Sequence, residues 1–250
     1  MSPLLDRGVP SDSQCALMMS AIIDNSAPRA AKLLAAGFDV NHIVNRKTGA
    51  SLLHSVIGEG DRPELARLFI DHGINVEHAN ALGDAPLIHA ICSARIDTMK
   101  VLLDAGACPD RPGHGGNLPL RLVMQLFGRQ GADLMRVLLS GGASCKRFLE
   151  TSGESALEFC VKGKRIECIK ALLSHGQDPD AVSPASGQSP LTLAQQLHQE
   201  NVHCAHRKVF SQEITERSEV FDLLRAWSDA KAAREAIDSI TAPLRKLEKA

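Results

Sequence analysis

The sequence predicts an all-α repeat protein, an α-solenoid in which helix-turn-helix units joined by short hairpin loops stack along one axis. Two independent landmarks support this fold class. A short apolar motif recurs six times, and its leucines are 33 to 37 residues apart, at Leu17, Leu53, Leu87, Leu120, Leu157 and Leu191. An amphipathic stretch that closes on glycine follows the motif in five units and keeps the same period. A fixed period of 20 to 50 residues is the sequence signature of a repeat architecture.

The first element expected in each unit is a short helix that starts at the motif. The six copies read SQCALMMS (13–20), TGASLLHSV (48–56), GDAPLIHA (83–90), GNLPLRLV (116–123), GESALEFC (153–160) and GQSPLTLA (187–194). Ser or Thr before the helix can cap it, and proline is tolerated in the first turn, where no hydrogen bond is lost. Pro86, Pro119 and Pro190 occupy that place.

The second element expected in each unit is a helix whose apolar residues lie three and four apart, as Leu65, Leu68 and Phe69 do. Asp61 and Asp97 stand where such helices should be capped. A closing glycine then supplies the left-handed conformation that ends a helix without a Cβ clash. These glycines are Gly37, Gly73, Gly106, Gly142 and Gly176, and hairpin loops such as residues 39–49 and 74–83 follow them.

A period near 33 with a start similar to G-x-T-P-L-H-x-A and an L-L-x-x-G end resembles the ankyrin repeat. The resemblance covers residues 12 to 228, about six units. It implies a single ankyrin-repeat domain over residues 1–228, with residues 229–250 as a C-terminal helical cap or tail. For His54, the histidine of the motif, it implies a structural role, a hydrogen bond from the ring to the backbone of a neighbouring repeat. The other copies carry Met18, Ile88, Arg121, Glu158 and Thr192 at this position.

The last unit departs from the pattern by about 17 extra residues, near 199–216. This insertion either lengthens the first helix of the unit to cover the end of the stack or forms a binding loop. The tail after Trp227 reads as a helix that Pro243 should break or restart. It is either a closing helix for the last repeat or an amphipathic hook for a partner.

Composition and motifs exclude several classes of function. The formal net charge of −1 provides no general attraction to nucleic acid or to an anionic membrane, and no apolar stretch is long enough to span a bilayer. The amino terminus lacks the pattern of a secretory signal, so we expect a cytoplasmic protein. The chain has no phosphate-binding loop, no nucleophile elbow and no H-E-x-x-H motif. We therefore expect neither an enzyme nor a cofactor.

One cluster of metal-binding side chains stands against that expectation. Residues 198–206 contain His198, His203, Cys204 and His206, and His203 and His206 would share a face of a helix. Zinc needs four ligands, and no second cluster with matching spacing accompanies this one. The alternatives are a polar loop or helix extension and a metal-binding or hydrolytic site.

The ankyrin resemblance also implies where a partner would bind. Partners of ankyrin repeats usually dock on the hairpin tips and on the concave face of the first helices, at the residue after the motif histidine. That position is occupied by Met19, Ser55, His89, Leu122, Phe159 and Leu193. The last three form an apolar stripe if they face solvent, whereas neighbouring units could instead shield them. The hairpins add a polar rim of candidates: Arg46, Lys47, His78, Asn80, Arg111, His114, Lys146, Arg147 and Phe148.

The predicted function is a non-catalytic adaptor, inhibitor or regulator that binds another protein as a monomer. A composition rich in alanine and leucine, with no tyrosine, suggests a GC-rich bacterial source. In that setting the protein would act in the cytoplasm of the producing cell, or in a host cell if it is exported as an effector. An immunity protein that neutralises an enzyme or toxin is an alternative within the same class.

Overall fold

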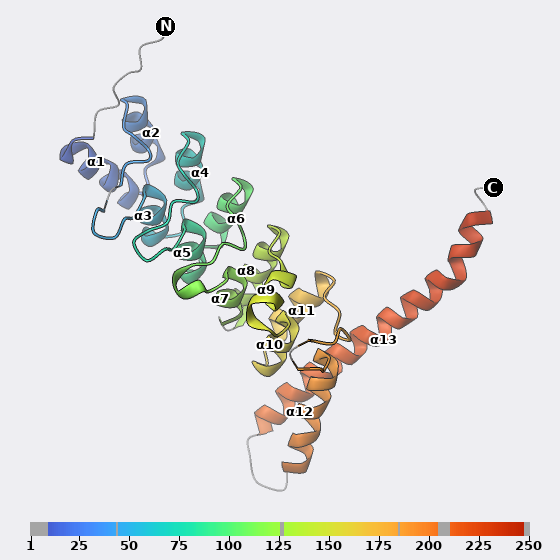
Figure 1. Cartoon of the computed structure of the whole chain (residues 1–250). Coiled ribbons are helices and arrows are strands. Elements are labelled where there is room, and N and C mark those ends of the chain that lie inside the picture. The colour runs from blue at the N-terminus through green and yellow to red at the C-terminus, as the bar shows by residue number, and fades with distance from the viewer. Residues whose placement is uncertain (1–9, 44, 126–127, 185, 205–210, 248–250) are drawn as a thin grey trace. The chain divides into compact units, whose positions relative to one another are not determined.

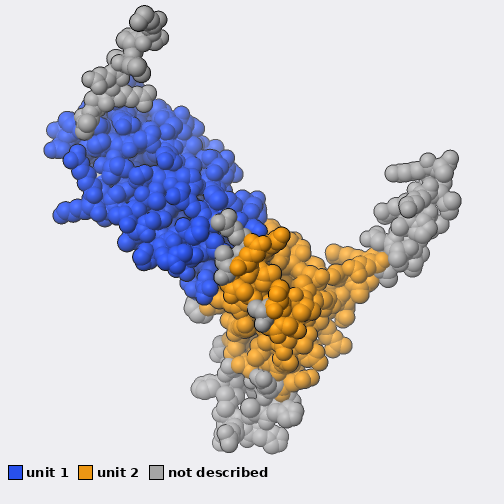
Figure 2. Space-filling model, in the orientation of Figure 1, with its two compact units in different colours: residues 1–144 blue, residues 145–250 orange. Residues whose placement is uncertain are grey.

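The computed structural model describes residues 10–43, 45–125, 128–184, 186–204 and 211–247. Within these ranges only the backbone is described at residues 128–129, 147, 151, 200–204, 211–214 and 236–247. The chain forms two compact units, residues 1–144 and residues 145–250, which are coloured separately in Figure 2. Each unit is considered by itself.

The first unit is a stack of paired helices, each pair belonging to one repeat. The pairs are α1 (Asp12–Ile23) with α2 (Ala27–Ala35), α3 (Leu52–Glu59) with α4 (Pro63–Asp71), α5 (Pro86–Cys92) with α6 (Ile96–Asp104), and α7 (Pro119–Gln125) with α8 (Gly128–Ser140). A 3-10 turn, η1 (His114–Gly116), precedes α7. The helices α1, α3, α5 and α7 pack against one another in one layer, and α2, α4, α6 and α8 form a second layer (Figure 1).

The second unit contains α9 (Cys145–Ser152), the pair α10 (Ala156–Lys162) and α11 (Ile166–Ser174), and the pair α12 (Pro190–Cys204) and α13 (Ser211–Leu247). Across the described part of the chain the only β-type pairing is an isolated bridge between Asn45 and Ala50. The predicted all-α fold of helix pairs is therefore confirmed. Pro86, Pro119 and Pro190 each open a helix, as expected from their tolerance in the first turn.

The helix α9 is where the structure differs from the expected hairpin tip. The stretch that contains Lys146, Arg147 and Phe148 is helical, and Phe148 is fully buried with its ring edge-on to Phe159, at a centroid distance of 6.0 Å. The interpretation of Phe148 as a rim residue is thus wrong. The physical reason is that residues 145–152 form an amphipathic helix, in which Cys145, Phe148, Leu149 and Ser152 lie three and four residues apart and share one face, while Lys146 is exposed.

The closing glycines adopt the conformation that the sequence predicts. Gly37, Gly73, Gly106, Gly142 and Gly176 have φ values from 80° to 93°. Each ends the second helix of a repeat and releases the chain into the next hairpin. The motif leucines Leu53, Leu87, Leu120 and Leu157 are all buried, whereas Leu17 in α1 is 50% exposed.

The aspartates expected to cap helices act differently from the prediction. The residues at the N-cap positions of α4 and α6 are Arg62 and Arg95. The Asp61 carboxylate instead accepts the backbone N–H groups of Asp97, at 3.0 Å, and Thr98, at 2.8 Å, in the first turn of α6. Asp61 therefore caps the second helix of the following repeat, and the cap joins two repeats.

In the last repeat, the described part of the insertion is helical. The helix α12 extends to Cys204, and α13 is continuous across residues 228 and 229 and through Pro243. The expected boundary after residue 228 therefore falls inside one helix, and the expected break at Pro243 is wrong. Proline removes one N–H and clashes with a carbonyl one turn earlier, which bends a helix without necessarily ending it.

The first part of α13 packs on the last repeats. Val220 and Leu224 are buried, and α13 contacts both α12 and α11. Lys231 forms an ion pair with Asp178, and Ser228 Oγ donates to Asp180 at 2.7 Å, so the hairpin before α12 is tied to α13. Whether residues 229–250 act as a cap or as a hook for a partner stays a prediction. Among the described residues no helix has the length and apolar character needed to cross a membrane.

Candidate partner-binding site

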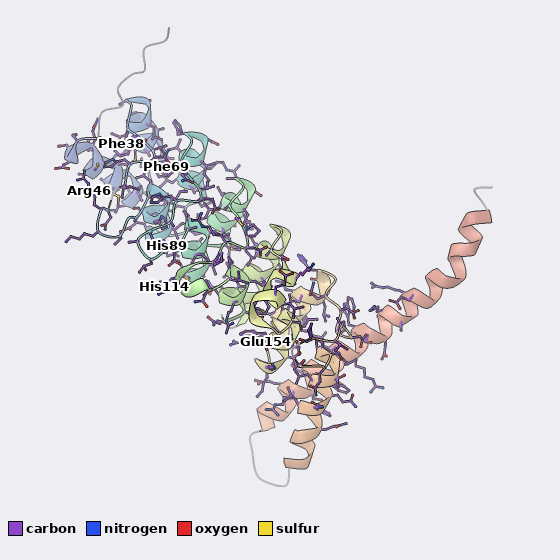
Figure 3. The ribbon with its side chains drawn as sticks, in the orientation of Figure 1. Phe38, Arg46, Phe69, His89, His114 and Glu154 are labelled. Atoms are coloured by element: carbon purple, nitrogen blue, oxygen red, sulfur yellow. The ribbon has the colours of Figure 1, made fainter. Side chains whose placement is uncertain are left out.

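A pocket of about 730 Å³ opens on the first unit between the helices α1, α3 and α5 and two successive hairpins. It brings together three residues that follow the motif-histidine position in consecutive repeats, Met19, Ser55 and His89, with the hairpin residues Arg46 and Lys47. Figure 3 shows Arg46 at the first hairpin and His89 on α5. The remaining lining residues are Asn45, Thr48, Ala50, His54, Asn80, Ala81 and Leu82. We refer to this site as the hairpin pocket.

The first hairpin forms one wall of the hairpin pocket. The Asn45 side-chain oxygen accepts the backbone N–H groups of Lys47, at 3.0 Å, and Thr48, at 3.2 Å. An asparagine turn of this kind fixes the tip locally and leaves the side chains of Arg46 and Lys47 exposed. Ala81 N–H donates to the Thr48 carbonyl at 2.8 Å, which joins the second hairpin to the first.

Gly49 is needed where these two hairpins meet. Its φ is +63°, in the left-handed region that favours glycine, and a Cβ there would lie 3.1 Å from the Ala81 nitrogen. Any side chain would therefore have to displace the contact between the hairpins. The Gly49 carbonyl also accepts a hydrogen bond from His78 Nε2 at 2.9 Å, so the half-buried His78 of the second hairpin stabilises the first hairpin.

The floor of the hairpin pocket contains His54, which is buried. Its Nε2 lies 3.0 Å from the Asp84 carbonyl, and its Nδ1 lies 2.9 Å from Ser51 Oγ and 3.3 Å from the Ser51 nitrogen. Because a carbonyl only accepts, Nε2 carries the hydrogen and Nδ1 accepts. Burial lowers the pKa of His54 and outweighs the hydrogen bond to Asp84, so the ring is neutral. The inter-repeat hydrogen bond that the resemblance implies is present.

The ring of His89 stacks on the ring of His54. The two rings stack at a centroid distance of 5.8 Å and an interplanar angle of 28°. Burial lowers the pKa of His89, which is half-buried, and its Nδ1 has no hydrogen-bond partner among the residues that the structure describes. This nitrogen is itself buried, so His89 contributes its ring surface to the pocket lining.

Two of the predicted rim residues stabilise the hairpins instead of lining the pocket. Arg111 forms an ion pair with Glu77 at 2.7 Å and also donates to the Glu77 carbonyl at 2.8 Å. His114, on η1, is exposed, and its backbone N–H donates to Asp84 Oδ1 at 2.6 Å. Both residues connect adjacent hairpins.

The three apolar candidates occupy equivalent helix positions but stay outside the hairpin pocket. Leu122 lies on α7 of the first unit, and Phe159 and Leu193 lie on α10 and α12 of the second unit. Each is half-buried. An apolar stripe through all three stays a prediction, and the side chain of Arg147 lies outside the described residues.

The histidine and cysteine cluster near the C-terminus is described only in part. The His198 ring stacks on Phe221 at a centroid distance of 5.4 Å and an interplanar angle of 14°. The side chains of His203 and Cys204, and all of His206, lie outside the described residues. Where side chains are described, no group of three His, Cys, Asp or Glu residues could hold a metal ion.

Sequence reasoning missed the apolar lining of the hairpin pocket at Ala50, Ala81 and Leu82. The local sequence does not show which neighbouring repeat the small and apolar residues of a hairpin contact. Leu82 itself was an available signal, because a large apolar residue is unusual at the exposed tip of a hairpin. Leu82 is 63% exposed, among the most exposed large apolar side chains that the structure describes.

Comparison with known families agrees with this geometry. The family model for ankyrin repeats in three copies matches residues 17–112, the segment that contains the whole hairpin pocket. The chain is an ankyrin-repeat protein. Ankyrin repeats are protein–protein interaction modules. A crystal structure of the human ASB11 ankyrin repeat domain matches 84% of the chain and 82% of that domain, with a TM-score of 0.53 and 22% identity, and shows the same fold.

Two relatives of this ankyrin-repeat protein illustrate how widely its sequence features occur. The human B-cell lymphoma 3 protein is 30% identical over 152 residues, which is 58% of the chain and 33% of the relative. Protein PhlB of Serratia liquefaciens is 32% identical over 115 residues, which is 46% of the chain and 49% of the relative. The chain thus matches a third to a half of the length of these relatives.

Proposed function

We propose that this ankyrin-repeat protein is a non-catalytic interaction module that binds another protein at the hairpin pocket. The observation that carries the proposal is the convergence, in one pocket, of Met19, Ser55 and His89 from three consecutive first helices with the tips of two hairpins. Ankyrin repeats as a class use these two surfaces for interaction. Both ring nitrogens of His54 are hydrogen-bonded within the fold, to Ser51 and to the Asp84 carbonyl, as in a structural group.

The size of the hairpin pocket suits an anchoring role. Its volume of about 730 Å³ is large enough for one or two large side chains, whereas a stable interface buries on the order of 800 Å² on each partner. The hairpin pocket would therefore hold the central residue of a larger contact, as anchoring residues in protein interfaces do. The exposed Leu82 at its edge supplies an apolar contact for that residue.

Site-directed photo-crosslinking tests this proposal. A benzoylphenylalanine placed at Leu82 faces the hairpin pocket, and the same residue placed at the exposed Arg67 on α4 serves as a matched control in the other helix layer. We expect irradiation in a lysate of the native cell to link one protein to the Leu82 position and none to the Arg67 position. Excess unlabelled chain should suppress the adduct, and unlabelled chain with Ser55→Trp, which fills the hairpin pocket, should not. Equal labelling at both positions would argue against the site.

The narrower roles stay predictions from the sequence. These are a bacterial effector, an immunity protein for an enzyme or toxin, a monomeric state and a cytoplasmic location. The metal-binding alternative at His198, His203, Cys204 and His206 also stays a prediction.

A further inference from the structure

The charged side chains that line the hairpin pocket are all positive. Its lining residues include two cations, Arg46 and Lys47, and no carboxylate. Both side chains are exposed, and neither takes part in an ion pair or a side-chain hydrogen bond with the described residues. Four other cations of the first unit form ion pairs, Arg29 with Asp24, Arg111 with Glu77, Lys100 with Asp97 and Arg136 with Asp133.

The acidic side chains nearest to the hairpin pocket in the chain are already engaged by other groups. Asp84 Oδ1 accepts the His114 N–H at 2.6 Å. The Glu77 carboxylate binds Arg111 and accepts the Cys108 N–H at 2.7 Å. Neither carboxylate pairs with Arg46 or Lys47, whose side chains are exposed to solvent, although the chain as a whole carries a formal net charge of −1.

The interior of the hairpin pocket is apolar and carries a few polar groups. Met19, Ala50, Ala81 and Leu82 supply apolar surface. Thr48, Ser55 and Asn80 supply polar side chains at the same site. An apolar cavity with a few convergent polar groups selects a large apolar side chain and fixes the backbone that carries it.

We infer that the hairpin pocket binds an acidic segment of a partner protein, in which a large apolar side chain enters the pocket and neighbouring Asp or Glu carboxylates pair with Arg46 and Lys47. This inference rests on the proposed function and specifies the chemistry of its ligand. A nucleic acid fits less well, because two cations neutralise few phosphates and no Phe, Tyr or Trp lines the pocket to stack on bases.

Peptide selection with the full chain tests the inference. The probe is a library of random 12-residue peptides displayed on phage and selected on the immobilised protein. We expect enriched peptides to contain Leu, Ile, Met or Phe with at least two Asp or Glu residues within about four positions. The tightest peptide, synthesised with a fluorescent label, is then titrated by anisotropy at low and at high salt. Binding should weaken with salt, because exposed ion pairs are screened.

Charge variants identify the residues responsible. Arg46→Glu with Lys47→Glu should weaken binding of the peptide at least about tenfold, and Arg46→Gln with Lys47→Gln should have an intermediate effect. Lys32→Glu with Arg67→Glu makes the same change of charge at exposed positions on α2 and α4, and binding should stay within about twofold of the unchanged protein. Far-UV circular dichroism confirms that each variant is folded.

The outcomes separate this inference from the proposed function. Enrichment of basic or uncharged peptides, or equal binding by the hairpin and control variants, would overturn the inference that the ligand is acidic. A crosslink at Leu82 would in that case still support the pocket as the interaction site. A failure to enrich any peptide over the Arg46→Glu and Lys47→Glu variant would also overturn it. Loss of the crosslink at Leu82 as well would remove the proposed function itself.

Discussion

At the scale of single residues, the position after the motif leucine joins one repeat to the next by more than one chemistry. His54 does so as a neutral ring between Ser51 and the Asp84 carbonyl. Glu158, fully buried at the equivalent position, accepts the Ser155 N–H at 2.8 Å and the Ser186 hydroxyl at 2.5 Å. A capping box within the repeat is thus combined with a contact to the following hairpin.

Glu158 is ionised although it is buried. Burial raises the pKa of its carboxyl, but hydrogen bonds from Ser186 and Ser155 favour the charged form and hold the pKa below its ordinary value. A buried carboxylate is tolerated when several donors satisfy it. The role is therefore a cross-repeat contact. The residue type that fills it depends on whether the next hairpin presents an acceptor, as the Asp84 carbonyl does for His54, or a donor, as the Ser186 hydroxyl does for Glu158.

Replacing Glu158 tests this role. We expect Glu158→Ala to lower the free energy of unfolding by about 2 to 3 kcal/mol, because it removes hydrogen bonds to a charged group and leaves buried donors unsatisfied. Glu158→Gln keeps one acceptor and should cost less. The single tryptophan, Trp227 on α13, reports unfolding of the second unit by fluorescence in urea. Equal stability of the alanine variant and the unchanged protein would show that Glu158 contributes nothing to the stack.

At the scale of elements, the hairpins of the first unit are joined by a repeated hydrogen bond. Asn41, Glu77 and Asp110 each stand four residues after a closing glycine, and the side-chain oxygen of each accepts a backbone N–H of the following hairpin. The donors are Asn75 at 2.8 Å, Cys108 at 2.7 Å and Ser144 at 3.0 Å. The next equivalent residue is Lys146, which has no acceptor and lies in α9.

Asp110 provides the clearest test of this series. Asp110→Ala should lower the free energy of unfolding by about 1 to 2 kcal/mol, because the Ser144 N–H then loses its charged acceptor. Asp110→Asn retains a side-chain carbonyl and should recover about half of the loss. Urea denaturation followed by circular dichroism provides the comparison. If the asparagine and alanine variants were equally destabilised, the hydrogen bond would not be the cause.

At the scale of the whole molecule, stability should depend on pH through the buried histidines. Burial lowers the pKa of both His54 and His89. The unfolded chain, in which each ring has a pKa of about 6.5, therefore binds protons at a higher pH than the folded chain. The stability that these neutral rings contribute is complete above that value and is lost as the pH falls through the folded pKa.

Thermal unfolding at a series of pH values checks this expectation. The midpoint should fall as the pH is lowered from 7.5 to 5.5, and His54→Gln, which keeps hydrogen-bonding groups but does not titrate, should reduce that dependence while lowering stability at pH 7.5. Lys32→Gln on α2 is a control that should leave the pH dependence unchanged. A midpoint that rose on acidification would contradict the assignment of neutral rings.

Local patterns in the sequence were enough to predict the repeat. The period, the helix starts at Pro86, Pro119 and Pro190 and the left-handed closing glycines all follow from chemistry within one unit, so local patterns were sufficient to predict them. The hydrogen-bonding role of His54 was implied by the resemblance of its motif to the ankyrin repeat, and the hydrogen bond to the Asp84 carbonyl is present.

Which residues of different repeats meet follows from how the repeats stack. The cap that Asp61 places on α6 and the hairpin pocket join residues that are distant from one another in the sequence. The burial of Phe148 depends on α9, a helix in a place where the repeat pattern predicts a hairpin. Ser55, His89, Arg46 and Lys47 were predicted separately, and their convergence with Leu82 required the stacking of three repeats. The physical reason is that each repeat buries its apolar face and completes its helix caps only against its neighbours. The surface that could bind a partner is therefore a property of the stack and not of any one repeat.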